Sequence, residues 1–181
     1  EEIDLKKRKI KLLQEANYYT EEIRRIIKDN YGFDKLYAEG LSIKSALDVN
    51  YQLYALSALR SGIEAYDRRH GWRGPILNKK EKKNWQEILK EKKIDSSLNW
   101  HFAEIADVNE SEIIFKTVDK NEKGKISIDN LKWAINKTIN TSFKINDIIY
   151  VKKNKGEKWS LKQYPKVNGA IIVIDPLNGK V

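Results

Sequence analysis

The chain has 181 residues, enough for one ordinary domain or two small ones, and its apolar fraction of 40% is that of a globular protein. It contains no cysteine, which excludes a disulfide framework and a thiolate metal site, and its longest apolar run, residues 170–174, is far shorter than the ~20 residues of a membrane helix. The net charge of +9 would favour nucleic acid, anionic lipid headgroups or an acidic partner, although lysines spread among Ile and Asn also fit a biased base composition of the gene.

The first third of the chain has a helical pattern. Apolar residues recur at helical spacing over residues 3–31, which predicts one or two amphipathic helices that Gly32 can end in a left-handed conformation. The stretch GLSIKSALD, residues 40–48, is typical of a strand, and Asp48 is placed to cap a second helix that runs to Gly71. The apolar side of that second helix consists of Val49, Leu53, Leu56, Ile63 and Tyr66.

The pattern changes after Pro75. The charged stretch NKKEKKNWQEILKEKK, residues 78–93, has a small apolar face and predicts a short surface helix or a linker. Residues 98–108 then alternate, with Glu104 falling on the apolar side, and four further short strands rich in Ile, Val, Tyr and Trp follow. The apolar side of the first strand is Leu98, Trp100, Phe102, Ala106 and Val108. Five short strands in about seventy residues suit a small antiparallel barrel.

Residues 119–130, DKNEKGKISIDN, partly match a calcium loop. Lys123 stands at the fifth ligand position, where its ammonium repels a dication, and Asn130 stands where a bidentate glutamate is needed. The preceding segment is β-branched and alternating, unlike the helix of a calcium-binding hand. We interpret the stretch as a hairpin turn in which Gly124 takes a positive φ. The matching positions are Asp119, Asn121, Gly124 and Ile126.

Catalytic constellations are scarce. His70 and His101 lie in different segments, and we interpret each as a hydrogen-bonded structural residue and not as a general base. The sequence has no Gly-rich phosphate loop and no acidic pair with a spacing that brings two carboxylates together. We therefore predict no catalytic residue, no cofactor and no metal site in this chain.

The peptide AYDRRHGWRGP, residues 65–75, permits two interpretations. As a functional patch, Arg68, Arg69, Arg73 and Trp72 would clamp phosphates and stack on a base or a sugar. As a structural joint, the same cations would lie at the C-terminal end of a helix, the chain would turn at Gly71 and Gly74, and Trp72 would be buried between two domains. We favour the joint.

Several of these segments, taken in order, resemble the class A penicillin-binding proteins of the penicillin-binding protein 1A type. They are GLSIKSALD, YDRRHGWRGP, NLKWA (residues 130–134), NDIIYV (146–151), KWSLKQYP (158–165) and VNGAIIVIDPLNGKV (167–181). The resemblance covers residues 15–181, and YDRRHGWRGP together with the last segment carries most of its specificity. Two positions depart from the family pattern: Val49 replaces a proline, and Ile135-Asn136 replaces an Arg-Pro. The second departure leaves open the chain path after Ala134.

The resemblance implies an α+β fold with a small OB-like antiparallel β-barrel inserted after a helical linker. Residues 1–78 would be the linker and the first elements of a transpeptidase domain, residues 79–165 the inserted OB-like domain, and residues 166–181 the first strand and turn after the return to the transpeptidase domain. In the family, a membrane anchor and a glycosyltransferase domain precede this region and the rest of the transpeptidase domain follows it. The absence of methionine and the start at EEIDLKK also suggest an excised segment.

The acyl-enzyme chemistry of the family needs S-x-x-K, S-x-N and K-T-G motifs. No serine here has a lysine three positions later, and Lys116-Thr117 and Lys137-Thr138 are followed by Val118 and Ile139 and not by glycine. The glutamate motif of the glycosyltransferase is not found either. We therefore predict that this segment is not an enzyme, although its parent would be a peptidoglycan glycosyltransferase and a serine-type transpeptidase.

The leading hypothesis is a noncatalytic spacer and docking module of a bifunctional peptidoglycan synthase in cell-wall biosynthesis. Its partners would be the rest of the parent chain and, beyond that, regulators of cell-wall synthesis or peptidoglycan, on the periplasmic side of the inner membrane. Contact with the membrane would come only through the anchor of the parent. The alternative is an OB-fold module that binds single-stranded nucleic acid, and a calcium module is disfavoured by Lys123.

Overall fold

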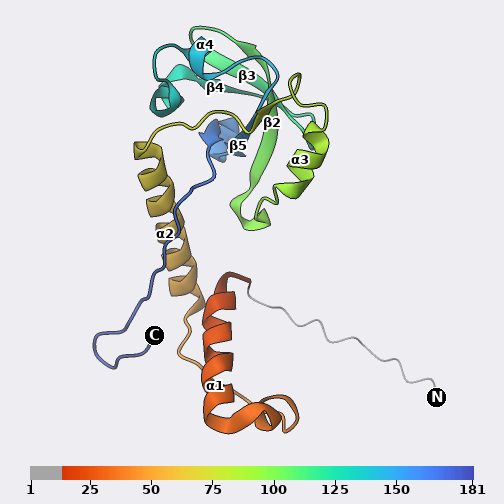
Figure 1. Cartoon of the computed structure of the whole chain (residues 1–181). Helices are drawn as coiled ribbons and strands as arrows, with labels where there is room; N and C mark the ends of the chain where they lie inside the picture. Colours follow the sequence, from red (N-terminus) through yellow and green to blue (C-terminus); the bar gives the residue numbers. More distant parts are fainter. Residues whose placement is uncertain (1–13) are drawn as a thin grey trace, which may run out of the picture. The chain divides into compact units, whose positions relative to one another are not determined.

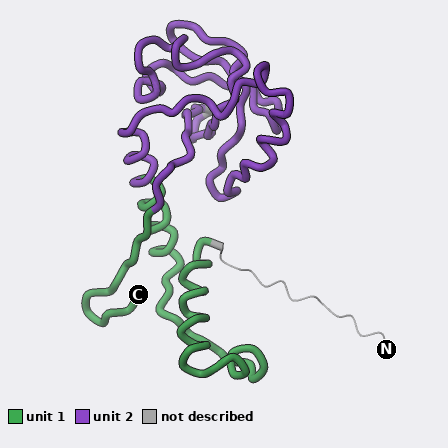
Figure 2. The backbone as a smooth tube through the Cα atoms, viewed as in Figure 1, with its two compact units in different colours: residues 1–61, 169–181 green, residues 62–168 purple. Residues whose placement is uncertain are grey.

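A computed structural model describes residues 14–181, so the first part of the predicted helical pattern, residues 3–13, lies outside the described residues. The chain divides into two compact units (Figure 2). Unit 1 consists of residues 1–61 and 169–181, and unit 2 consists of residues 62–168. Unit 1 thus contains chain from both sides of unit 2, which is the connectivity of an inserted domain. The three boundaries predicted from the sequence remain predictions.

Two helices dominate the first third of the chain (Figure 1). A short 3-10 helix η1 (Gln14–Ala16) leads into α1 (Asn17–Tyr37). Gly32, with φ 85° and ψ 169°, interrupts the helical backbone where the sequence predicted the helix to end, but helical chain resumes and continues to Tyr37. The second helix, α2 (Val49–Arg69), begins in unit 1 and ends in unit 2. The Asp48 side chain accepts hydrogen bonds from the backbone N–H groups of Asn50 (2.8 Å) and Tyr51 (3.1 Å). The predicted N-cap is therefore confirmed.

Two predicted strands are not formed in unit 1. Residues 40–48 and 170–174 have no strand pairing. The turn predicted after residue 174 does form, and a hydrogen bond from the Asp175 N–H to the Lys180 carbonyl (2.8 Å) closes it. A strand needs a partner ladder, and the one sheet of residues 14–181 runs from β1 to β6 in unit 2 and includes neither segment. Most of their large apolar side chains are exposed as a result, from 42% for Leu41 to 73% for Ile172, whereas Leu47 is half-buried.

Unit 2 contains a six-stranded antiparallel sheet in the order β1-β5-β2-β3-β4, with β6 paired to β5. The strands are β1 (Leu77–Asn78), β2 (Trp100–Val108), β3 (Glu112–Thr117), β4 (Lys123–Ser127), β5 (Asp147–Lys153) and β6 (Trp159–Lys162). The predicted α+β class is confirmed. No pairing within residues 14–181 joins β4 to β6, so the sheet is not closed into the predicted barrel. The Trp159 side chain of β6 lies against Gly124 of β4. A side-chain contact therefore stands in place of the β4–β6 hydrogen bonds that would close a barrel.

Short helices cover the sheet. The predicted surface helix after Pro75 is confirmed as α3, whose Leu89 is buried against β1 and β5. The segment after Ala134, whose path the sequence left open, forms α4 and then buries Phe143 in the main core. The helices of unit 2 after α2 are α3 (Trp85–Glu91), η2 (Ser96–Leu98), η3 (Ile128–Asn130), η4 (Lys132–Ala134), α4 (Ile139–Ser142) and η5 (Lys155–Glu157).

The face of β2 that packs on the main core was predicted wrongly from the sequence. Ala103 and Ile105, both fully buried, face the main cluster, and a register shift between Ile105 and Asp107 leaves Ala106 exposed. Phe102 packs on a second cluster under β1 and α3. Both faces of the strand are therefore covered, and simple alternation cannot show which face meets the larger core. The main cluster includes Ile113, Phe115, Ile126, Leu131, Ile149, Val151 and Leu161.

The sequence that partly matches a calcium loop forms a β-hairpin, as predicted, in which β3 and β4 pair antiparallel. The position of the positive φ was predicted wrongly. Asn121 takes it, with φ 56°, whereas Gly124 lies in β4 opposite Phe115. A Cβ at Gly124 would lie 2.4 Å from the Phe115 ring and 2.9 Å from Trp159 Nε1, so glycine is required there by space and not by backbone conformation.

Candidate functional site: the junction at Asp67

The helix α2 ends in the peptide that the sequence singled out. Arg68 and Arg69 lie in its last turn, where cations complement the helix dipole, and Gly71 (φ 86°) and Gly74 (φ 92°) turn the chain away from the helix. These parts of the predicted joint are confirmed. They bring Arg73 back toward the helix end, beside Asp67.

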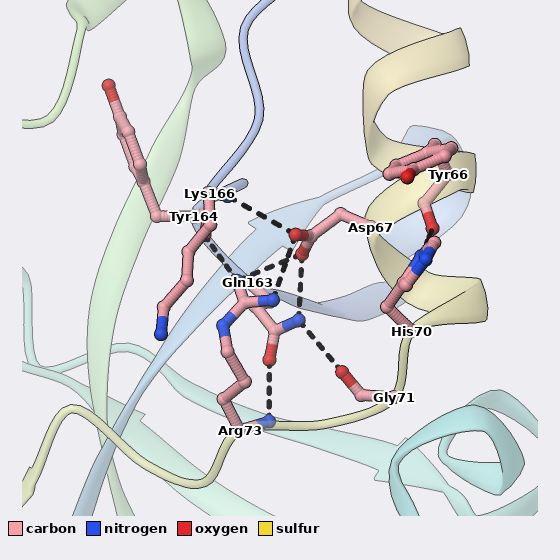
Figure 3. Close-up of polar contacts among 8 residues, drawn as sticks. All are labelled: Tyr66, Asp67, His70, Gly71, Arg73, Gln163, Tyr164 and Lys166. Carbon is pink, nitrogen blue, oxygen red and sulfur yellow. Dashed lines mark hydrogen bonds and ion pairs between the residues drawn. The ribbon is translucent and has the colours of Figure 1, made fainter.

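The carboxylate of Asp67 is the centre of this junction (Figure 3). Its Oδ1 accepts hydrogen bonds from Arg73 Nη1 (2.8 Å) and from the Lys166 backbone N–H (3.2 Å). Its Oδ2 accepts from Arg73 Nη2 (3.0 Å) and from Gln163 Nε2 (2.7 Å). Asp67 is 4% exposed, so these four bonds replace water at both oxygens.

The electrostatics of Asp67 follow from this geometry. Burial alone would raise the pKa of its carboxyl, because it disfavours the charged form. The hydrogen bonds from Arg73, Gln163 and the Lys166 backbone outweigh burial and hold the pKa of Asp67 below its usual range. Asp67 is therefore a buried anion that the folded structure stabilises, and not a proton donor at neutral pH.

Gln163 and Arg73 extend the junction to the backbone. The Gln163 Oε1 accepts from the Arg73 N–H (2.9 Å), and its Nε2 also donates to the Gly71 carbonyl (3.1 Å). Arg73 Nη2 donates to the Tyr164 carbonyl (2.7 Å). The segment by which the chain enters unit 2 is thus hydrogen-bonded to the segment by which it leaves (Figure 3).

A second ion pair links α2 to β6. Lys162, 9% exposed, donates from Nζ to Glu64 Oε2 (2.5 Å), and its ammonium lies 5.6 Å from the centre of the Trp100 ring. Burial lowers the pKa of Lys162, although the hydrogen bond to Glu64 acts in the opposite direction. Arg68 Nη2 donates to the Leu161 carbonyl (3.3 Å), which adds a second link between α2 and β6.

Trp72 belongs to the core of unit 2. Its ring lies 5.6 Å from the Trp133 ring and 5.6 Å from the Phe143 ring, and Arg68 stands over Trp133 at 5.1 Å. The alternative interpretation needed Trp72 and the arginines as an open phosphate clamp, but Trp72, Arg68 and Arg73 are held by contacts within unit 2. The burial of Trp72 against a transpeptidase domain remains a prediction.

Both histidines are hydrogen-bonded, as predicted. His70 Nδ1 lies 3.0 Å from the Tyr66 carbonyl, and His101 Nδ1 lies 2.9 Å from Asp119 Oδ2. The Asp119 carboxyl is partly buried, which raises its pKa, but its contacts with His101 prevail and lower it overall. Within residues 14–181, no group of three or more His, Asp or Glu side chains lies close enough to hold a metal ion.

Sequence reasoning missed Asp67, Gln163 and Lys162. One signal was available, because an aspartate in the last turn of a helix faces the negative end of the helix dipole and needs a compensating donor. Arg73 lies six residues later in the same peptide. Gln163 and Lys162 carried no such signal, because they reach their partners from 96 and 98 residues away.

Comparison with known proteins agrees with this architecture. Residues 72–167 match the family described as the penicillin-binding protein OB-like domain. The chain belongs to this family, and the OB-like character expected of the sheet is confirmed. Penicillin-binding protein 1A of Rickettsia typhi is 36% identical over 183 residues, which cover 99% of this chain and 23% of that protein. The corresponding protein of Escherichia coli is 26% identical over 92% of this chain and 21% of its own length.

The resemblance to class A penicillin-binding proteins of the 1A type is therefore confirmed, and the chain spans less than a quarter of the length of these relatives. The crystal structure of penicillin-binding protein 1A from Haemophilus influenzae superposes with a TM-score of 0.59 at 23% identity, over 83% of this chain and 22% of that one, and shows the same fold. Among residues 14–181, no helix has the length and apolar character needed to cross a membrane.

Proposed function

We propose that unit 2 is a noncatalytic module inserted in a bifunctional peptidoglycan synthase, where it spaces the polymerising and cross-linking sites. The observation that carries this proposal is the Asp67 junction, which fastens the entry of the unit to its exit. A domain inserted into a host must begin and end at neighbouring points, because the host backbone would otherwise be pulled apart.

Unit 1 supports the same proposal. Its segments 40–48 and 170–174 come from the two sides of unit 2, and both expose apolar side chains without a strand partner. Exposed apolar surface of this kind marks an interaction site. We assign both segments to the transpeptidase domain of the parent, whose further strands would pair with them.

The parent protein would act in cell-wall biosynthesis on the periplasmic side of the inner membrane, held there by its own anchor. Its chemistry would reside elsewhere in the chain, because S-x-x-K and K-T-G do not occur in these residues. The partners of unit 2 would be the flanking catalytic domains and, through its free surface, regulators or the glycan itself.

The test uses the complete synthase with residues 76–161 replaced by a short Gly/Ser linker, so that both chain segments of the Asp67 junction are kept. Glycan polymerisation and acylation by penicillin, each measured alone, should be retained. Cross-linking of newly made glycan, which needs both sites to act on one strand, should fall. Loss of penicillin acylation would show that unit 2 is part of the catalytic domain, and unchanged cross-linking would show that it spaces nothing.

A further inference from the structure

Unit 2 contains a groove of about 750 Å³ between the turn after α2 and the segment that joins β4 to β5. Trp72 and Trp133 line its wall, and Asn136 and Ser142 contribute an amide and a hydroxyl. Its volume is within the range of small-molecule sites. Of the hydrogen-bonded residues of the Asp67 junction, Gly71 alone also lines this groove.

A buried carboxyl group also lines the groove. Asp147 is 4% exposed, and it accepts hydrogen bonds from Asn78 Nδ2 at Oδ1 (2.8 Å) and from the Lys144 backbone N–H at Oδ2 (2.7 Å). Two carboxylate oxygens can accept about four hydrogen bonds, so acceptor capacity remains for a donor in the groove. Burial raises the pKa of Asp147, and the nearby charge of Glu81 acts in the same direction.

The charged residues that line the groove favour a neutral ligand over a polyanion. The chain as a whole carries a net charge of +9, but the groove is lined by the carboxyl groups of Asp147 and Glu81 and by one lysine, Lys144. A polyanion such as nucleic acid would meet repulsion here. A neutral ligand that offers both hydroxyl donors and acceptors would match the carboxyls, the amides and the Ser142 hydroxyl.

Trp72 and Trp133 are partly engaged by each other, by Phe143 and by Arg68, and the parts of their side chains that line the groove point to the same class of ligand. Sugar rings have apolar C–H faces that pack on indole, and OB folds bind oligosaccharides with the loops at the ends of their strands.

We propose that this groove binds a short segment of a neutral saccharide chain. That the saccharide is the glycan made by the parent synthase rests on the proposed function, whereas the site itself rests on the lining of the groove. The saccharide would lie along the segment between β4 and β5, with hydroxyl groups directed at Asp147 and Asn136.

The test titrates the 181-residue chain with a tetrasaccharide of β-1,4-linked N-acetylglucosamine. The expected result is saturable binding that shifts the indole N–H resonances of Trp72 and Trp133. Asn136→Ala removes an exposed side chain that has no hydrogen bond within the described residues, and it should weaken binding about fivefold. The control Lys116→Ala, on the exposed outer face of β3, should leave the affinity unchanged.

The proposal is overturned by the absence of saturation up to about 10 mM saccharide, a concentration that detects even very weak sites. It is also overturned if Asn136→Ala binds the saccharide as tightly as the unchanged chain does. A third contrary result would be a single-stranded oligonucleotide or a cell-wall peptide that reverses the saccharide-induced resonance shifts at a concentration lower than that of the saccharide. Failure here would leave the spacer role standing, because that role is measured by cross-linking in the complete synthase.

Discussion

The guanidinium of Arg73 meets the carboxylate of Asp67 at two points, 2.8 Å at Oδ1 and 3.0 Å at Oδ2, across six residues of chain. A two-point contact fixes the relative orientation of both planar groups, which a single contact would leave free. Gln163 and the Lys166 backbone use the remaining positions of the carboxylate. One side chain therefore determines how the end of α2 meets the segment after β6 by which the chain leaves unit 2.

Substitution of Asp67 should destabilise unit 2. Asp67→Ala leaves the partly buried Arg73 and the Gln163 amide without their shared acceptor, and we expect a loss of about 3 kcal/mol in the free energy of unfolding, measured by urea denaturation with tryptophan fluorescence. The control is Asp129→Ala, which removes an ion pair to Lys132 that is more than 70% exposed on both sides and should have no measurable effect. Equal effects of the two substitutions would contradict the role of Asp67.

The two buried aspartates should titrate on opposite sides of the ordinary value. The pKa of Asp67 is lowered, so its stabilisation is present above about pH 4 and is lost as the pH falls through its native pKa. The pKa of Asp147 is raised, so its contribution is greatest at low pH and is lost as the pH rises through its native pKa. Carboxyl carbon resonances followed from pH 2 to pH 7 report both groups, on the scale of about 4 for a free Asp. A higher pKa for Asp67 than for Asp147 would refute this assignment.

Local features of the fold were readable from the sequence, and features that need a distant partner were not. The Asp48 cap, the break at Gly32 and the stop at Gly71 each depend on a few neighbouring residues. The strands expected at 40–48 and 170–174 depend on a ladder that lies outside both segments, so neither forms among residues 14–181.

The Asp67 junction shows the same limit within unit 2. Its helix end and its glycine turns were predicted. The role of the Asp67 carboxylate was not, because one of its donors, Gln163, lies 96 residues away in the chain. Gly124 illustrates a different difficulty, since a glycine serves either a positive φ or a close contact, and the sequence does not distinguish the two.

Loss of the Asp48 cap should weaken the start of α2. Asp48→Ala removes the acceptor of the Asn50 and Tyr51 N–H groups, and a cap of this kind contributes about 1 kcal/mol. We expect faster amide hydrogen exchange in the first turn of α2, with no change at Asp67. Asp48→Asn keeps a side-chain acceptor and should restore most of the protection. Exchange rates that are the same in all three proteins would show that the cap does not hold the helix start.

The free energy of unfolding should change with opposite signs when Gly124 and Gly62 are each replaced by alanine. At Gly124 a methyl group would lie 2.4 Å from the Phe115 ring and 2.9 Å from Trp159 Nε1, so Gly124→Ala must displace one of two buried aromatic side chains. Overpacking of this kind costs about 1–3 kcal/mol. At Gly62, inside α2, nothing lies within 4 Å of the added methyl group, and the helical backbone favours alanine by about 1 kcal/mol. Urea midpoints of the two variants should therefore move in opposite directions, and a Gly124→Ala protein as stable as the original would show that β4 and β6 are not packed through Trp159.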